Sequence, residues 1–407
     1  TSRVLTCILS NETESSLVQK EMTLLSENQL AFRDMTRKFV REEVLPNIMQ
    51  WDDECQLPRE MWRRLGRLGL QGVCAPQEWG GAGGDFISYA LIVEELAYGD
   101  CAIANNVGGA NFPFVAAMLK YGTKEQKEEY LRPVVSGDHY ISLLLSEPHT
   151  GSDLSKIKTR AVRKGDKWIV NGEKCFVTGG STSDVALLLA VTDPDAGKKG
   201  ISCFIIRPLS QGYKVLRKEK KLGHRTIDIC HILLEDMEIP DSAVLGELGE
   251  GYKLILEGLD CSRIGVAAQS VGVAQAAFDA ALEYSKERVA FGKPIFEHQA
   301  LGFSLAEMAT QIEAARQLCL YAARMKDLGL DSIREASMAK LFASNMAERV
   351  CTAALQVFGG SGYIQGSTVE KCYRDQRVLQ IYEGTNEVLK LLLHRHLGKT
   401  AARNTVS

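Results

Sequence analysis

In the first third of the chain, apolar residues recur every three or four positions, which places them on one face of an α-helix. Ser26 and Glu27 offer polar side chains suited to a helix start. The same spacing predicts further helices over residues 58–68, 87–98 and 124–131, the last ended by Pro133. The segment 21–138 is therefore expected to be mainly helical. The apolar face of its first helix would consist of Leu30, Phe32, Met35, Phe39 and Val40.

Between residues 139 and 246 the pattern changes to short runs that are rich in β-branched residues. Residues 168–170 lie between Gly165-Asp166 and Asn171-Gly172, two dipeptides typical of hairpin turns. No helical pattern separates the runs, so we expect an antiparallel barrel or sandwich. The other predicted strands are 185–191, 201–206 and 229–234.

From residue 251 to residue 398 the helical pattern returns in longer pieces. Gly329 is expected to end one helix, and another is predicted over residues 333–358. Long helices with short connections favour an antiparallel bundle. The first helix has an apolar stripe wide enough that we expect part of it to face another subunit. This stripe consists of Leu301, Leu305, Met308, Ile312, Ala315, Cys319 and Ala322.

Composition narrows the classes of function. The 407 residues include 48 basic and 51 acidic side chains, a net charge of -3, which gives no reason to expect nucleic-acid or polybasic membrane binding. No apolar run approaches the roughly 20 residues that span a membrane. Residues 1–18 are polar and lack a signal-peptide core. Eleven cysteines without CxxC pairs predict reduced thiols, in a bacterial cytoplasm or a mitochondrial matrix, and no metal site.

Five motifs occur in a fixed order along the chain. They read SEPHTGSD at 146–153, RVAFG at 288–292, EHQ at 297–299, QVFGGSGY at 356–363 and IYEGTNE at 381–387. One such motif would be weak evidence, but five at compatible spacing are specific. Together they closely resemble the acyl-CoA dehydrogenase family, and the resemblance covers about residues 24–397.

The resemblance implies an α+β fold of three domains. These are an N-terminal α-helical domain (21–138), a central β domain (139–246) and a C-terminal four-helix bundle (251–398), usually assembled as a homotetramer. It also implies FAD-dependent oxidation of an acyl-CoA thioester to the trans-2-enoyl-CoA. A base removes the α-proton, the β-carbon gives a hydride to flavin N5, and an electron-transfer flavoprotein receives the electrons.

Glu383 matches the catalytic carboxylate of the family. Some members place the base opposite a segment that here reads Asp260-Cys261-Ser262-Arg263, which offers no glutamate, so Glu383 is the only good candidate. The implied substrate contacts are Ser152, Asp260, Ser262, Arg263, Tyr382, Gly384 and Arg395. The implied FAD contacts are Ser146, Ser152, Phe176, Thr178 and Thr385, with Arg288, Phe291, Gln299, Gln356 and Gly360 supplied by a neighbouring subunit.

Several positions depart from the family pattern. Leu143 stands where several relatives carry tyrosine, His149 replaces a small residue, and Asn386-Glu387 replaces the frequent Ser-Gln. The glycine-rich segments 80–84 and 246–251 are interpreted as loops, because neither joins a strand to a helix as a dinucleotide fingerprint does. His394 and His396 would point in different directions from one helix.

The acyl group is the least determined feature. Small Ala104 and Gly108 leave room for a branched or ring-shaped group, and Asn105 offers a polar contact, so we expect a short, branched or otherwise non-linear acyl-CoA. Three functions stay open at this stage. The chain is an acyl-CoA dehydrogenase, an oxidase, monooxygenase-like or non-redox CoA enzyme on the same fold, or a scaffold without catalysis.

Overall fold

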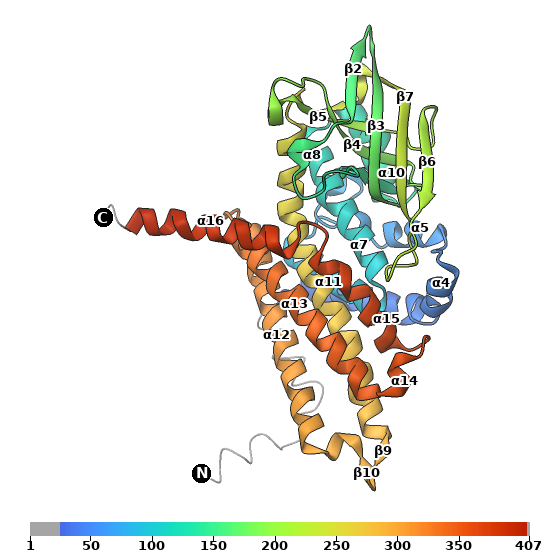
Figure 1. The fold of residues 1–407 in the computed structure, drawn as a ribbon, viewed down its shortest axis with the longest axis vertical. Helices are drawn as coiled ribbons and strands as arrows, with labels where there is room; N and C mark the ends of the chain where they lie inside the picture. The colour runs from blue at the N-terminus through green and yellow to red at the C-terminus, as the bar shows by residue number, and fades with distance from the viewer. Residues whose placement is uncertain (1–24, 405–407) are drawn as a thin grey trace.

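The computed structural model describes residues 25–404, and the side chains of 25–398. Residues 1–18 and the first four residues of the expected N-terminal domain, 21–24, lie outside this range. Figure 1 shows a sheet at one end of the molecule, long helices at the other end, and the N-terminal helices packed against both. The three parts follow one another along the chain in the expected order, helical, sheet and helical.

The N-terminal part is helical, as predicted. Ser26 caps its first helix, because its hydroxyl accepts from the Gln29 N–H and the Gln29 side chain accepts from the Ser26 N–H. Pro133 was expected to end a helix, which is wrong: it lies in the first turn of α10, where no N–H is needed. The helices are α3 (Glu27–Phe39), α4 (Ile48–Glu54), α5 (Glu60–Arg67), α6 (Phe86–Gly99), α7 (Cys101–Gly109), α8 (Ala116–Tyr121), α9 (Lys124–Gln126) and α10 (Arg132–Val135).

The central part is an eight-stranded sheet in the order β6-β7-β3-β2-β4-β5-β8, with β1 beside β4. Most neighbours are antiparallel, as expected, but β1 and β2 run parallel to β4. The strands are β1 (Ile141–Leu144), β2 (Arg160–Lys164), β3 (Lys167–Thr178), β4 (Val185–Val191), β5 (Ile201–Ile206), β6 (Tyr213–Lys218), β7 (Ile229–Pro240) and β8 (Val244–Leu245).

One of the two predicted hairpin turns is correct. Lys164 pairs with Lys167 across Gly165-Asp166. Asn171-Gly172, in contrast, lies inside β3, where the pairing with β7 shifts register. The glycine is required there because a Cβ atom would lie 2.4 Å from the Thr159 hydroxyl.

Strands β4 and β5 are buried on both faces, so their sequences read as continuous apolar runs. Alternate residues such as Leu187 and Leu189 pack toward the helices, whereas Ala186 and Leu188 pack into a second core within the sheet. In that second core Trp168 of β3 lies edge-on to Phe204 of β5. Strands that are not neighbours in the sheet therefore share a core, as in a barrel or sandwich.

The C-terminal part is built on α11 (Gly251–Glu287), which packs against α12 (Gln299–Asp327), α13 (Ile333–Phe358) and α6. A short hairpin of β9 (Val289–Ala290) and β10 (Lys293–Pro294) joins α11 to α12 at the end far from the sheet (Figure 1). The other helices are α14 (Gly360–Tyr363), α15 (Thr368–Asp375) and α16 (Asn386–Asn404).

The predicted apolar stripe of α12 is buried inside this chain. Only Leu301 is half-buried, whereas the other six residues are buried. The expectation that part of the stripe faces another subunit is therefore wrong for those six, because α11, α13 and α6 already cover them.

A buried cluster of charges joins the three parts of the fold. The Lys371 ammonium on α15 donates to Asp100 (2.7 Å) at the start of α7 and to Asp375 (2.5 Å). Asp375 also accepts from the backbone N–H of His224 (2.6 Å) in the sheet domain. Burial alone would lower the pKa of Lys371, but the two carboxylates raise it well above its usual value. Helix α15 therefore stays attached to both other parts through charged hydrogen bonds.

We predict that Lys371→Met lowers the free energy of unfolding by about 3–5 kcal/mol, because it leaves two buried carboxylates without their cation. Urea titration followed by circular dichroism measures the change. Lys167→Met is the control, since Lys167 forms an exposed pair with Glu238 and should cost less than about 1 kcal/mol. Equal losses in the two variants would contradict a joining role for Lys371.

Candidate active site

Glu383 lies in a sharp turn between the short helical segment Gln376–Gln380 and α16. Its φ is +54°, and that of Gly384 is +90°. The left-handed region is uncommon for a residue with a side chain and is often found at functional sites. The turn directs the Glu383 side chain toward α11, where Ser262 lies.

The Glu383 carboxylate is poorly hydrated. It is half-buried, and one oxygen accepts from the Ser262 hydroxyl at 2.6 Å. Loss of water raises the pKa of Glu383, while the Ser262 hydrogen bond and the positive charges of Arg263 and Lys340 oppose that rise. The result is a carboxylate that holds a proton more strongly than an exposed glutamate does.

A small cavity of about 10 Å³ lies against Glu383. Residues expected from the sequence to shape the acyl pocket, Ala104, Asn105 and Gly108, do line it. The buried hydroxyl of Tyr89 has no hydrogen-bond partner among the described residues. It fits because position 265 is glycine: a Cβ atom there would lie 2.2 Å from that hydroxyl.

A larger cavity of about 280 Å³ lies beside Tyr382, where the three parts of the chain meet. Thr178 comes from the end of β3, His224 from the loop before β7, and Asn105 from α7. Asn105 lines this cavity as well as the one beside Glu383. The buried Nε2 of His224 has no partner within the described chain.

Other predicted cofactor contacts lie on the loops of the sheet domain. Phe176 is 70% exposed and has a φ of +56° in the irregular end of β3, two residues before Thr178. Ser146 is half-buried, and its carbonyl accepts from the Cys175 N–H at 3.0 Å. Ser152 is exposed on the following loop.

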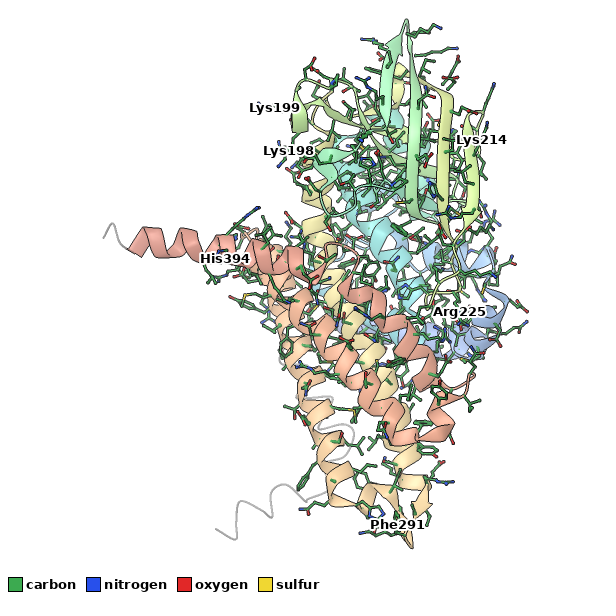
Figure 2. All side chains as sticks on the ribbon, viewed as in Figure 1. Lys198, Lys199, Lys214, Arg225, Phe291 and His394 are labelled. Carbon is green, nitrogen blue, oxygen red and sulfur yellow. The ribbon has the colours of Figure 1, made fainter. Side chains whose placement is uncertain are left out.

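Five further predicted cofactor contacts lie away from Glu383. They are exposed and belong to the hairpin region or to the adjoining ends of α12, α13 and α14. Figure 2 shows Phe291, 96% exposed, at the tip of the molecule farthest from the sheet. One chain therefore does not bring the two predicted groups together. The distant group consists of Arg288, Phe291, Gln299, Gln356 and Gly360.

The predicted substrate contacts also lie in more than one place. Ser262 and Arg263 are buried on α11 beside the Glu383 turn, and Arg263 donates to Asp260 at 2.6 Å. Thr385, a predicted FAD contact, follows Gly384 in the same turn and caps α16, where its hydroxyl accepts from the Val388 N–H at 3.3 Å. Arg395 lies exposed on the part of α16 that extends away from the body of the molecule (Figure 1).

Sequence reasoning missed two groups beneath the turn. The Lys340 ammonium donates to the Gly384 carbonyl at 2.8 Å and to the Asn386 side chain at 3.1 Å. Lys340 lies on the buried face of α13, where Ala336 and Ala343 flank it one turn away on either side. A buried lysine on a helix face made mostly of small apolar residues is unusual, and that signal was present in the sequence.

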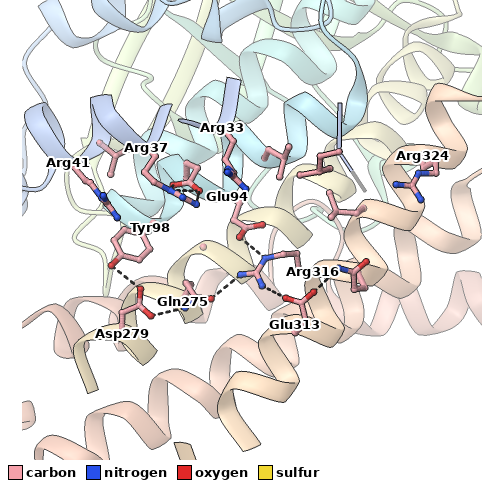
Figure 3. Close-up of a pocket in the computed structure, with 17 residues that line it drawn as sticks. Arg33, Arg37, Arg41, Glu94, Tyr98, Gln275, Asp279, Glu313, Arg316 and Arg324 are labelled. Carbon is pink, nitrogen blue, oxygen red and sulfur yellow. Dashed lines mark hydrogen bonds and ion pairs between the residues drawn. The ribbon is translucent and has the colours of Figure 1, made fainter. Parts of the chain in front are cut away.

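A third cavity, of about 490 Å³ and larger than the other two, lies elsewhere, between α3, α6, α11 and α12. Figure 3 shows charges of both signs on its walls. Arg316 pairs with Glu94 (2.9 Å) and Glu313 (2.5 Å), and Arg37 pairs with Glu95 (2.6 Å). No predicted site residue lines this cavity. The pairs made by Glu94 and Glu95 join α6 to α12 and to α3, whereas the Glu313 pair lies within α12.

Three further observations concern metal binding, membrane-spanning helices and the cysteines. Within residues 25–404 no group of three or more histidine, cysteine or acidic side chains is placed to hold a metal ion. No helix in the same range is long and apolar enough to cross a membrane. Eight of the ten described cysteines are buried, as expected for reduced structural thiols.

Comparison with known proteins agrees with this geometry. The chain matches the N-terminal, middle and C-terminal domains of acyl-CoA dehydrogenase over residues 26–138, 142–237 and 249–398. An acyl-CoA dehydrogenase of Bacillus subtilis is 39% identical, with 92% of this chain and 98% of the relative covered. The CarC subunit of the caffeyl-CoA reductase–Etf complex of Acetobacterium woodii is 38% identical, with 90% and 97% covered.

A solved structure shows the same fold. Butyryl-CoA dehydrogenase from Megasphaera elsdenii superposes with a TM-score of 0.89 at 38% identity, covering 92% of this chain and 98% of that chain. All three domains are therefore present, and both overall sequence and fold agree. The chain belongs to the acyl-CoA dehydrogenase family of FAD-dependent oxidoreductases.

Proposed function

We propose that this enzyme oxidises the CoA thioester of a short, branched or otherwise non-linear acid to its trans-2-enoyl-CoA, with Glu383 as the base. The observation that carries the proposal is the Glu383 carboxylate, held in a left-handed turn beside a cavity and poorly hydrated. The α-proton of a thioester is weakly acidic. A base with a raised pKa is better matched to it than an exposed carboxylate.

Other residues of the chain orient the base and bind the substrate during this proton transfer. Ser262 orients the Glu383 carboxylate, and Gly384 lets the backbone approach the thioester closely. Bound FAD would accept the hydride that leaves the β-carbon. Removal of water from the cavity strengthens every charge–dipole contact made to the reacting atoms. The proposed contacts to the rest of the acyl-CoA are Ser152, Asp260, Arg263, Tyr382 and Arg395.

The larger cavity fits the flavin ring. Its walls are mostly apolar, Thr178 and the unpartnered His224 supply polar atoms, and the exposed Phe176 lies two residues from Thr178. Ser146 and Thr385 would hold the same cofactor from either side. An exposed aromatic and an unpartnered imidazole are both groups that a bound ring system would cover.

The distant group of predicted contacts favours a shared cofactor. Arg288 and Gln356 are exposed, and Phe291 lies at the far tip of the same chain. We infer that these residues, with Gln299 and Gly360, bind the pyrophosphate and adenine end of FAD held mainly by a neighbouring subunit. The guanidinium of Arg288 is suited to two parallel hydrogen bonds with a phosphate. A homotetramer is the assembly we propose.

The electron acceptor and the acyl group are inferred from the relatives together with the cavity. A relative that works in a complex with Etf supports an electron-transfer flavoprotein as partner. A butyryl-CoA dehydrogenase among similar structures supports a short acyl group, as does the narrow cavity closed by Tyr89 and Phe112. Gly108 leaves sideways room for a branch, and Asn105 offers a polar contact.

We also propose domain boundaries at 21–138, 139–246 and 251–398, and a location in a bacterial cytoplasm or a mitochondrial matrix.

We predict that Glu383→Gln gives a folded, yellow protein that binds acyl-CoA but reduces its flavin at least about 100-fold more slowly, because the amide is not a base. Anaerobic bleaching of the flavin absorbance, with straight, branched and cyclic acyl-CoA, measures both rate and preference. Glu387→Gln is the control, an exposed glutamate on α16. Flavin reduction by Glu383→Gln at the wild-type rate would rule Glu383 out as the base.

The pH dependence of the rate of flavin reduction should reflect the raised pKa of Glu383. The base works only when deprotonated, and burial raises its pKa, so the rate of flavin reduction should rise with pH through a midpoint above the ordinary glutamate value of about 4.3. Ser262→Ala removes a hydrogen bond that lowers this pKa, so its midpoint should lie higher still. Stopped-flow traces across pH give both midpoints. A downward shift in Ser262→Ala would contradict the assignment.

We predict that Arg288→Ala weakens FAD retention about 10- to 100-fold, the loss expected for charged hydrogen bonds to a phosphate. FAD absorbance after dialysis measures retention, and size-exclusion chromatography checks that assembly is unchanged. Lys286→Ala is the matched control, an exposed cation near the same helix end paired only with Glu283. Equal retention in the two variants would count against a shared cofactor site.

A further inference from the structure

We propose that Lys340 and Asn386 act together as a positioning pair, which fixes the catalytic turn from beneath and places a positive charge behind Glu383. This inference rests on the proposed function, because it assigns Glu383 the role of base. It adds two residues that line neither cavity: Lys340, which lies outside the five motifs, and Asn386, which the sequence marked only as a departure from the family pattern.

The first observation is how Lys340 is bound. Lys340 is fully buried, at 0% exposure of the residue, and its ammonium donates to the Gly384 carbonyl (2.8 Å) and the Asn386 carboxamide oxygen (3.1 Å). Both acceptors are neutral. A buried cation ordinarily needs a paired anion, since burying an unpaired charge costs several kcal/mol.

Two other buried lysines of this chain show the ordinary arrangement. Lys371 donates to two carboxylates, and Lys174 donates to Glu147 at 2.9 Å. Within the described residues no carboxylate forms an ion pair with Lys340. The positive charge of Lys340 is therefore balanced without a direct ion pair. The carboxylate of the turn that Lys340 holds, Glu383, supplies the negative charge.

The second observation concerns Asn386, one of the departures from the family pattern. Asn386 is buried, and three side chains of α13 hold its carboxamide. Its oxygen accepts from Lys340 and from Ser344 (3.2 Å), while its nitrogen donates to Ser344 (3.1 Å) and Asn345 (3.0 Å). An asparagine here is explained by this network. It fixes the start of α16 directly after the catalytic turn.

The geometry of the turn gives these bonds their effect. Glu383 and Gly384 both have positive φ, so the turn needs outside contacts to keep its conformation. Lys340 holds the carbonyl of Gly384, which fixes the peptide plane that follows the base. The same ammonium favours the ionised form of Glu383, so one side chain sets both the position and the charge of the base.

The charged surroundings of Lys340 define how this effect varies with pH. Burial lowers the pKa of Lys340 to about 8, Glu383 of the turn and Glu387 of α16 raise it, and Arg263 of α11 lowers it. Lys340 is therefore mostly protonated at neutral pH. Above about pH 8 it loses its proton, and Glu383 then loses the supporting charge.

The first test compares Lys340→Gln and Lys340→Met with the wild-type holoenzyme. Glutamine keeps a donor for the Gly384 carbonyl without the charge, and methionine keeps neither. We expect the acid midpoint of flavin reduction to rise by about 0.5–1 pH unit in both variants. Lys167→Gln is the matched control: it makes the same substitution at an exposed lysine that pairs with Glu238 in the sheet domain, so its midpoint should stay at the wild-type value. A Lys340→Gln midpoint equal to that of the wild type overturns the proposal.

A second test needs no turnover. Melting temperatures of the wild type, Lys340→Gln, Glu383→Gln and the double variant form a cycle that measures coupling between the two side chains. We expect Glu383→Gln to raise the melting temperature more in the Lys340→Gln background, where the carboxylate lacks its cation. Equal changes in both backgrounds overturn the positioning pair. Absence of flavin reduction by any acyl-CoA would instead count against the proposed function, while the cycle still decides the role of Lys340.

Discussion

Removal of water from the Glu383 carboxylate is the constraint on which the rest of the site depends. A carboxylate that must take a proton from carbon gains from poor hydration, because burial raises its pKa, but the same burial makes its charge costly to hold. Ser262 on α11 and Lys340 on α13 reduce that cost from two sides. Both helices belong to the C-terminal part, so the proposed base is held by two long helices of that part. The sheet domain contributes two polar residues, Thr178 and His224, to the wall of the larger cavity beside Tyr382.

The residues around the larger cavity come from all three parts of the chain, so their relative positions depend on the contacts between those parts. The buried Lys371 cluster supplies such contacts, because α15 binds the start of α7 and the His224 loop through the same ammonium and carboxylates. Arg374 adds a bond from α15 to Asp52 on α4 at 2.8 Å. Helix α15 immediately precedes the segment that carries Glu383, so these charges help to place the Glu383 turn relative to both cavities.

Periodicity in the sequence predicted the order of the three parts, and it placed β4, β5 and α13 at their observed bounds. It failed where tertiary contacts decide the outcome. Asn171-Gly172 has the composition of a turn but lies inside β3, because Gly172 is needed for the approach of Thr159. The motif at 381–387 pointed to Glu383 and the family resemblance at 260–263 pointed to Ser262, and the structure shows that their side chains are hydrogen-bonded. Lys340 lies outside the five motifs, and Asn386 stood in one of them only as a departure from the family pattern; the contact between them follows from how α13 packs beneath the turn.

The central claim is that Glu383 removes a proton from the α-carbon, and it can be measured apart from flavin reduction. An acyl-CoA with an α-CH₂ group and a quaternary β-carbon has no β-hydride to give, so only proton removal and return are possible. Incubation in D₂O followed by NMR of the acyl group measures exchange at the α-carbon. The account predicts that the wild-type enzyme incorporates deuterium there and that Glu383→Gln does not. Equal incorporation by both proteins would contradict it.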